Sequence, residues 1–262
     1  MRHTARAWVA PAALLLAAQS CLGLTAPATS SLPFGAPAPG GLHVLFIGNS
    51  LTYTNDLPGT LVAIAASGGD TIRTASLAFP NFAIIDHLTS GLAQQAIALD
   101  RWQFVVLQQG PTTLGINRDS LVLWTRMYDP LVRAQGAQPA LFMTWPDASR
   151  LAYLEESRLS YLAAAQAVNG VFLPAGEAWG AAWDSIPSLP LHGGDGFHPS
   201  TIGTYLAALV AYERITGHDA RLLPVASTIN GSNTGVPPGL DSATVRFLQR
   251  TSHRVLQRYA TP

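Results

Sequence analysis

Short apolar runs alternate with longer helix-like segments along most of this chain. Five runs read as β-strands, at residues 43–48, 71–78, 103–109, 140–145 and 170–174. The spacing of apolar positions predicts helices near 56–67, 82–98, 119–136, 149–168, 200–216 and 241–258. Three of the strands are continuously apolar rather than alternating, which is typical of strands covered on both faces. The pattern therefore predicts an α/β fold, a three-layer α/β/α sandwich with a mainly parallel five-stranded sheet.

Polar residues gather where these strands end. Ligands of parallel α/β sheets bind beyond the carboxyl ends of the strands, so these positions are candidates for a site. The segments are Ser50, Pro80-Asn81, Gln108-Gln109-Gly110, Thr144-Trp145 and Glu177, the last of which we expect to cap the following helix. Residues 218–240 are rich in Asn, Gly, Ser and Pro and predict a long surface connection.

The first forty residues differ in composition from the rest. Residues 1–25 contain two arginines, an apolar stretch too short to span a membrane and then small residues, which predicts a secretory signal peptide. A buried N-terminal helix is the alternative. Residues 26–40 are rich in Pro, Ala, Gly and Ser and predict a leader without a core, which leaves 41–262 as a single domain. We expect a secreted or periplasmic protein, although cleavage before Cys21 would leave it lipid-anchored at the cell envelope.

Composition narrows the function. Cys21 is the only cysteine, so the domain has no disulfide and no thiol nucleophile. Charged residues make up 11% of the chain and the formal net charge is zero, which gives no basic face for nucleic acid. No internal stretch has the length of a membrane span.

Two stretches carry residues suited to catalysis. "GNS", residues 48–50, follows the first strand, and "DGFHPS", residues 195–200, lies in a glycine-rich loop. A hydrolytic serine needs a base to take its proton and a carboxylate to orient that base. Ser50, His198 and Asp195 have these chemistries. The alternatives are that Ser50 belongs to an ordinary turn, Asp195 caps another turn and His198 is a surface residue.

Together these residues resemble the SGNH hydrolase family, the GDSL-like esterases and lipases. Gly48-Asn49-Ser50-Leu51 is similar to its nucleophile block, and Asp195-Gly-Phe-His198-Pro199 is similar to its acid-base block. The resemblance covers about residues 42–217 and implies a flavodoxin-like sandwich with Ser50, His198 and Asp195 as a catalytic triad. The Gly-x-Ser-x-Gly motif of ordinary α/β-hydrolases is not matched, because Thr52 stands at its last position.

The resemblance also implies an oxyanion hole. This chain departs from the family's pattern at two of the positions that supply its hydrogen-bond donors. The backbone N–H groups of Ser50 and of Asn81, which stands where the family has Gly, are two expected donors. The family's third donor, an Asn side chain, is missing from the stretch 110–113. We expect Gln109 to replace it; Gln108 and Thr112 are alternatives, and hydrogen bonds to loop backbone are another role for both glutamines.

Other residues have competing roles. His192, Asp195 and His198 do not match a common zinc arrangement, so we expect no metal and no cofactor. His87 lies within a helical run and is expected to be structural. Three tryptophans could line a sugar-binding cleft, but we favour a role in packing; they are Trp145, Trp179 and Trp183.

The sequence thus predicts a secreted serine esterase that hydrolyses a carboxylic ester. Secretion, the variant third block and the tryptophan content favour a short acyl group, acetyl above all, on a carbohydrate. A small-molecule ester, as of a short-chain lipid or aryl esterase, is the other substrate class. The missing Asn keeps open a non-catalytic carbohydrate-binding or surface protein on the same fold. An O-acyltransferase, with a sugar hydroxyl in place of water, is the third alternative.

Overall fold

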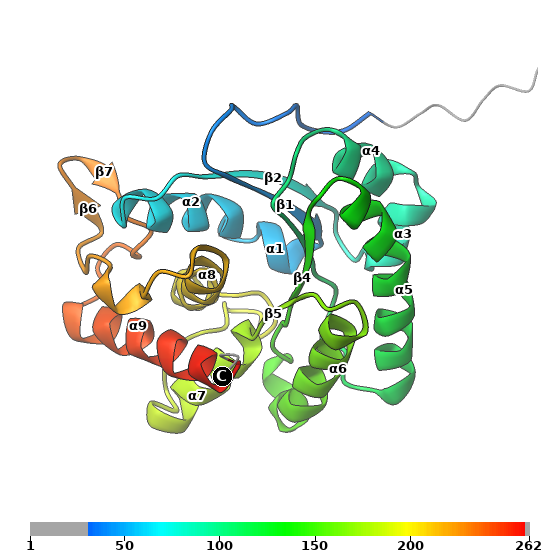
Figure 1. Ribbon diagram of the computed structural model, residues 1–262. Coiled ribbons are helices and arrows are strands. Elements are labelled where there is room, and N and C mark those ends of the chain that lie inside the picture. Colours follow the sequence, from blue (N-terminus) through cyan, green and yellow to red (C-terminus); the bar gives the residue numbers. More distant parts are fainter. Residues whose placement is uncertain (1–30, 260–262) are drawn as a thin grey trace, which may run out of the picture. The chain divides into compact units, whose positions relative to one another are not determined.

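The computed structural model describes residues 31–259, in which a parallel sheet is enclosed by helices (Figure 1). Its strands run in the order β2-β1-β3-β4-β5, and each neighbouring pair is parallel. They are β1 Leu42–Gly48, β2 Ile72–Ala78, β3 Phe104–Leu107, β4 Gln138–Phe142 and β5 Val171–Leu173. The predicted α/β sandwich with five parallel strands is confirmed.

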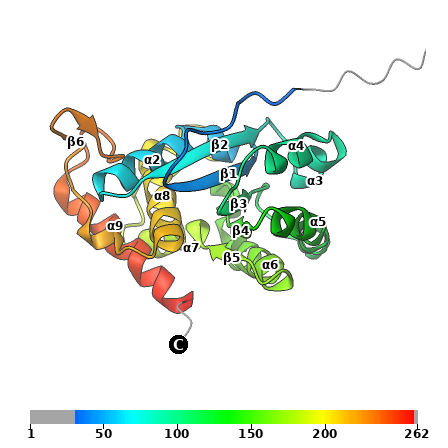
Figure 2. The same ribbon diagram turned by 45° about the horizontal axis from the view of Figure 1, so that its top comes forward.

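Alternate residues of the strands face two separate cores. Val44 and Phe46 of β1 belong to the core beneath α2 (Leu57–Ser67), α7 (Ala175–Ser185), α8 (Thr201–Thr216) and α9 (Ser242–Leu256). Leu45 and Ile47 belong to the core beneath α3 (Ile84–Thr89), α4 (Leu92–Ala98), α5 (Gly115–Ala134) and α6 (Leu154–Ala167). Figure 2 shows the two helical layers on opposite sides of the sheet. Burial on both faces explains why the strands are continuously apolar.

The helices depart from the predicted boundaries in several places. The run 82–98 is two helices, because Gly91 between them has a φ of 76°. The run 149–168 begins as a 3-10 turn, Ala148–Tyr153, and α5 begins four residues earlier than predicted. The connection 218–240 contains a 3-10 turn, Ala220–Leu222, and a short antiparallel hairpin, β6 Thr228–Ile229 and β7 Ser232–Asn233.

The sequence pattern assigns no residue range to helix α7, although Glu177 is expected there to cap a helix. Seven of its eleven residues are buried, and the exposed ones, Asp184 and Ser185, lie at its end. The expectation that Glu177 caps a helix is wrong. Its buried carboxylate lies in the first turn of α7 and accepts hydrogen bonds from Arg258, at 2.6 Å, and from the Tyr259 hydroxyl. Glu177 therefore ties α7 to the segment that follows α9.

The three tryptophans singled out in the sequence pack together beneath the sheet. Trp145 and Trp179 are buried and stacked, with ring centroids 3.6 Å apart and planes at 5°. Trp183 meets Trp179 edge-on, with centroids 5.5 Å apart. The packing role is confirmed, and the tryptophans give no support to a sugar-binding cleft.

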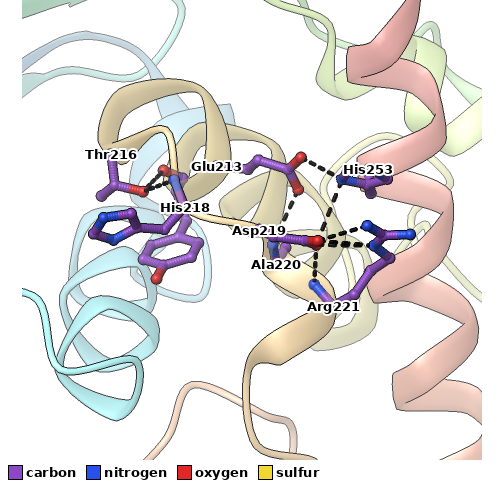
Figure 3. A network of polar contacts seen from close by, with 8 residues as sticks. Glu213, Thr216, His218, Asp219, Ala220, Arg221 and His253 are labelled. Carbon is purple, nitrogen blue, oxygen red and sulfur yellow. Dashed lines mark hydrogen bonds and ion pairs between the residues drawn. The ribbon is translucent and has the colours of Figure 1, made fainter.

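A network of charged groups joins α8, α9 and the turn between them (Figure 3). His253 of α9 lies 2.6 Å from a carboxylate oxygen of Glu213, whose other oxygen accepts from the Ala220 backbone N–H. Asp219 is engaged by the Arg221 guanidinium at 2.6 Å. Glu213, Asp219 and His253 have the residue types of a metal site, but their oxygens already face donors, so the cluster serves to join these elements.

Two predictions concern residues that the structure does not describe. The signal peptide at 1–25 and the lipid anchor at Cys21 lie outside residues 31–259 and stay predictions. Residues 31–40, the described part of the leader, form neither helix nor strand, while Leu32 and Phe34 pack against the α3–α6 side of the domain. Within the described residues, no helix is both long and apolar enough to cross a membrane.

Candidate active site

The candidate nucleophile lies at a sharp corner between β1 and the short helix α1, Ser50–Tyr53. Asn49 is the N-cap of α1, and its side-chain oxygen accepts from the Leu51 N–H at 3.1 Å. A Cβ on Gly48 would lie 2.4 Å from Gln108 Oε1 and 2.5 Å from Thr52 Oγ1. Glycine is therefore required at position 48 because side chains approach the backbone closely.

Gln108, at the end of β3, braces this corner. Its Oε1 accepts from the Asn49 N–H at 2.9 Å and from the Thr52 hydroxyl at 2.7 Å. Its Nε2 donates to Asn49 Oδ1 at 3.0 Å and to the Gln109 carbonyl at 2.6 Å. Both donors of the amide are thus used inside the protein, which excludes Gln108 as the third oxyanion donor.

The candidate acid and base lie in a tight loop between α7 and α8. The loop is closed by an antiparallel bridge between His192 and Pro199. Asp195 Oδ1 accepts from the backbone N–H groups of Phe197, at 3.0 Å, and His198, at 2.9 Å. The buried Trp145 donates its Nε1–H to the Phe197 carbonyl at 3.2 Å. Trp145 therefore anchors this loop to the core.

The structure brings Ser50, His198 and Asp195 into one hydrogen-bonded chain. His198 Nε2 lies 2.9 Å from Ser50 Oγ, and His198 Nδ1 lies 2.6 Å from Asp195 Oδ2. Because a carboxylate only accepts, Nδ1 carries the proton and Nε2 is left to accept from the serine hydroxyl. The His198 hydrogen bond, followed by those from backbone, holds the Asp195 pKa well below its usual range. This arrangement suits removal of the serine proton by His198.

Two residues with unpaired backbone N–H groups line the pocket at the nucleophile corner. The N–H groups of Ser50 and Asn81 have no hydrogen-bond partner within residues 31–259, and both residues line the same pocket. Asn81 has a φ of 62°, a left-handed conformation that Asn tolerates better than most residues. Asn49 Nδ2 donates to the Phe82 carbonyl at 3.0 Å and so fixes this loop against the nucleophile corner. The pair has the chemistry of an oxyanion hole.

Gln109 lines the same pocket, and its amide is only partly satisfied. Nε2 donates to Thr112 Oγ1 at 3.3 Å, and the buried Oε1 has no partner. Turning the amide by 180° would let Oε1 accept from Thr112 and would put Nε2 at the buried position where Oε1 now has no partner. The Thr112 hydroxyl donates to the Gly110 carbonyl at 3.1 Å in the present arrangement. Gln109 is thus better suited than Thr112 to act as the third donor.

The pocket beside Ser50 has a volume of about 350 Å³. We call it the acyl pocket; its lining combines aromatic rings with amides and a hydroxyl, among them Phe82, Gln109, Asn117, Ser120, Trp124 and Phe197. This volume is at the lower end of small-ligand sites, about 300–1,000 Å³. Trp124 was not singled out in the sequence, because an isolated tryptophan in a helical run carries no signal that it faces a site.

The other histidines of interest have structural partners. His87 is buried against Phe79 and Phe82, and its Nε2–H donates to the Gly48 carbonyl at 2.8 Å. Burial lowers its pKa, so the ring is neutral. His192 donates to the Pro146 carbonyl at 3.0 Å and packs against Trp179, away from any shared ligand position with His198.

Known structures resemble this fold, although no protein-family model matches the sequence and no curated protein matches it either. A putative SGNH hydrolase from Slackia heliotrinireducens is 26% identical, covering 67% of this chain and 100% of its own, with a TM-score of 0.56. A DUF4886 family protein from Bacteroides uniformis is 18% identical, covering 84% and 96%, with a TM-score of 0.69. An acetylxylan esterase from Geobacillus stearothermophilus, in a catalytic mutant form, is 15% identical, covering 71% and 97%, with a TM-score of 0.51.

The parallel sheet with a candidate serine nucleophile at the end of β1 is consistent with a carboxylic ester hydrolase of the α/β fold class. The similarity to the Slackia protein and the two sequence blocks indicate which family of hydrolases the chain resembles. These similarities support an assignment of the chain to the SGNH hydrolase family.

Proposed function

We propose that this protein is a serine esterase that hydrolyses a carboxylic ester through an acyl-enzyme. The observation that carries the proposal is the hydrogen-bonded chain from Ser50 through His198 to Asp195, which opens on a pocket with two free backbone N–H groups. A non-catalytic protein would have no use for a serine hydroxyl within 2.9 Å of an imidazole at a solvent-accessible pocket.

In the first half-reaction Ser50 Oγ attacks the ester carbonyl carbon while His198 Nε2 takes the serine proton. Asp195 holds the ring in the correct tautomer and stabilises its charged form. The N–H groups of Ser50 and Asn81, with the turned amide of Gln109, stabilise the oxyanion. Each such donor contributes about 3–4 kcal/mol to lowering the barrier.

The tetrahedral intermediate then collapses, and the bond between the carbonyl carbon and the alcohol oxygen breaks. His198 gives its proton to the leaving alcohol. In the second half-reaction a water molecule attacks the acyl-enzyme, His198 takes the water proton, and Ser50 recovers a proton as the carboxylic acid leaves. No cofactor enters these steps.

We propose a short acyl group, acetyl above all, carried on a carbohydrate. The acyl pocket, of about 350 Å³, is near the lower end of small-ligand sites and accommodates a short acyl group together with the reacting ester. The acetylxylan esterase among the similar structures has this kind of substrate and shares the fold. With the signal peptide expected at residues 1–25, we further propose that the enzyme acts outside the cytoplasm, where such esters occur.

Hydrolysis of p-nitrophenyl acetate by the purified protein tests the proposal. We expect kcat/KM to fall roughly 10⁴-fold or more in Ser50→Ala, as for other triads that lose a member. Ser90→Ala, which removes a hydroxyl bonded to the His87 carbonyl remote from the pocket, is the matched control and should retain activity. Equal rates for wild type and Ser50→Ala, with both proteins folded, would refute the mechanism.

A further inference from the structure

A second pocket lies at the same edge of the sheet as Ser50. It is formed where α2 and α8 begin, by Asn55, Thr60, Thr201 and Thr204, and is closed by the segment 227–238 around the β6–β7 hairpin. Helix α2 starts just after the nucleophile corner, and α8 starts just after the loop that holds His198. The first residues of both helices therefore lie at the carboxyl ends of the strands. We call this the polar pocket.

One hydrogen bond links the polar pocket to the candidate base. Asn55 Nδ2 donates to the Pro199 carbonyl at 2.8 Å and to Thr204 Oγ1 at 3.2 Å. Pro199 directly follows His198, so a wall of the polar pocket is bonded to the loop that carries the base. A substrate part that lies past His198, on the side away from the acyl pocket, meets this wall next.

The lining of the polar pocket is neutral and rich in hydroxyl groups. Its polar side chains come from Thr, Ser and Asn, and none of its lining residues is Asp, Glu, Lys, Arg or His. The hydroxyls of Thr60, Thr201 and Thr228 have no hydrogen-bond partner within residues 31–259, and Thr201 and Thr228 are exposed. Val236, Pro237 and Pro238 add an apolar wall. Such a surface offers donors and acceptors to a neutral polyhydroxylated ligand and no charge to an ion.

The chemistry of ester hydrolysis indicates on which side of Ser50 each part of the substrate lies. Asn81 and Gln109 line the acyl pocket, so the carbonyl and its acyl group belong there. His198 must reach the leaving oxygen to protonate it, so the alcohol part lies on the His198 side of Ser50. The polar pocket, of about 270 Å³, is joined to the His198 loop by the hydrogen bond from Asn55 to Pro199.

We propose that the polar pocket binds sugar units of the alcohol part of a carbohydrate ester, so that the enzyme acts on acetylated oligosaccharides in preference to acetylated monosaccharides. This inference rests on the esterase function proposed above. It adds a binding site separate from the triad and from the acyl pocket.

Kinetics with substrates of two lengths test the inference. The probes are partially O-acetylated xylohexaose, mannohexaose and chitohexaose, each compared with its O-acetylated monosaccharide, and p-nitrophenyl acetate is the internal reference. We expect kcat/KM for at least one hexaose to exceed that for its monosaccharide tenfold or more. In the double variant Thr201→Val, Thr228→Val this advantage should fall about tenfold, because each lost hydrogen bond weakens binding roughly 2- to 10-fold.

Two further variants are measured in the same assay, one that blocks the polar pocket and one matched control. Thr228→Phe, which fills the polar pocket, should also abolish the advantage of the hexaose. Thr71→Val removes an exposed threonine hydroxyl just before β2, at the opposite edge of the sheet, and should behave as wild type. Equal kcat/KM for every hexaose and its monosaccharide would overturn the inference, as would an advantage that survives in both pocket variants.

Calorimetric binding separates this inference from the esterase function. The full-length Ser50→Ala protein is titrated with the same three acetylated hexaoses, a measurement that requires no hydrolysis. Binding to Ser50→Ala that is lost when Thr228→Phe is added supports the polar pocket even if wild type fails to hydrolyse p-nitrophenyl acetate. Absence of binding to all three hexaoses overturns the inference, whatever the esterase assay gives.

Discussion

Gln108 and Gln109 are adjacent, yet replacing each by leucine should change the free energy of unfolding by very different amounts. In Gln108→Leu the buried N–H of Asn49 and the hydroxyl of Thr52 lose their acceptor. The two acceptors that Gln108 serves keep other donors, since Asn49 Oδ1 still accepts from Leu51 and the Gln109 carbonyl from Tyr161. Two orphaned buried donors, at about 1–3 kcal/mol each, predict a loss of about 2–6 kcal/mol in the free energy of unfolding.

Gln109→Leu removes only one long hydrogen bond, at 3.3 Å, and a buried oxygen that has no partner. We therefore expect a change of less than about 1 kcal/mol in the free energy of unfolding. Its kcat on p-nitrophenyl acetate should nevertheless fall roughly 10²–10³-fold, the usual effect of losing one oxyanion donor. Gln108→Leu should lose activity as well, because the corner that holds Ser50 loses its brace.

Urea unfolding followed by circular dichroism measures both stabilities, and steady-state kinetics measures both activities. Similar midpoints for the two leucine variants would refute the bracing role of Gln108. Wild-type kcat in Gln109→Leu would remove Gln109 from the oxyanion hole. Each outcome bears on one residue only, because the two side chains make no hydrogen bond to each other through their amides.

Three further predictions follow from the same contacts. Gly48→Ala should lower stability and activity together, whereas Gly115→Ala, whose added Cβ meets nothing within 4 Å, should change neither in urea unfolding and kinetics. His87 has a lowered pKa through burial, so protons favour the unfolded chain below about pH 6.5. The Tm of the wild type should therefore decrease as the pH is lowered below this value, and the Tm of His87→Gln should decrease less steeply. The same dependence of Tm on pH in both proteins would contradict this. Asn55→Ala should lower kcat about tenfold through a displaced His198 loop, and Asn230→Ala, also at positive φ, should not.

Much of the fold follows from local patterns. Strand β1 alternates between two cores and ends in a capping motif, so both its position and the corner at Ser50 can be read from the sequence. The loop with Asp195 and His198 is also local, since Asp195 bonds the backbone two and three residues ahead. The grouping of these two loops rests on topology, because the carboxyl ends of parallel strands share one edge.

Features that depend on distant contacts could not be predicted in this way. Gln108 is 59 residues from Asn49, and nothing near it in the sequence indicates that its amide fits the nucleophile corner. Helix α7 begins two residues after β5 ends and its first five residues are all buried, so its start continues the apolar run of the strand. Trp145, in the segment after β4, stacks on Trp179 of α7, and nothing near either residue in the sequence distinguishes this stack from a sugar-binding platform.

The central claim, that Ser50 is the nucleophile, is tested most directly by covalent labelling. The protein is treated with a fluorophosphonate, which traps serines activated by a base, and the adduct is located by peptide mass spectrometry. We predict a single adduct on Ser50, formed more slowly in Asp195→Asn and absent in His198→Ala. An adduct on a different residue, or none on a folded protein that hydrolyses p-nitrophenyl acetate, would contradict the account.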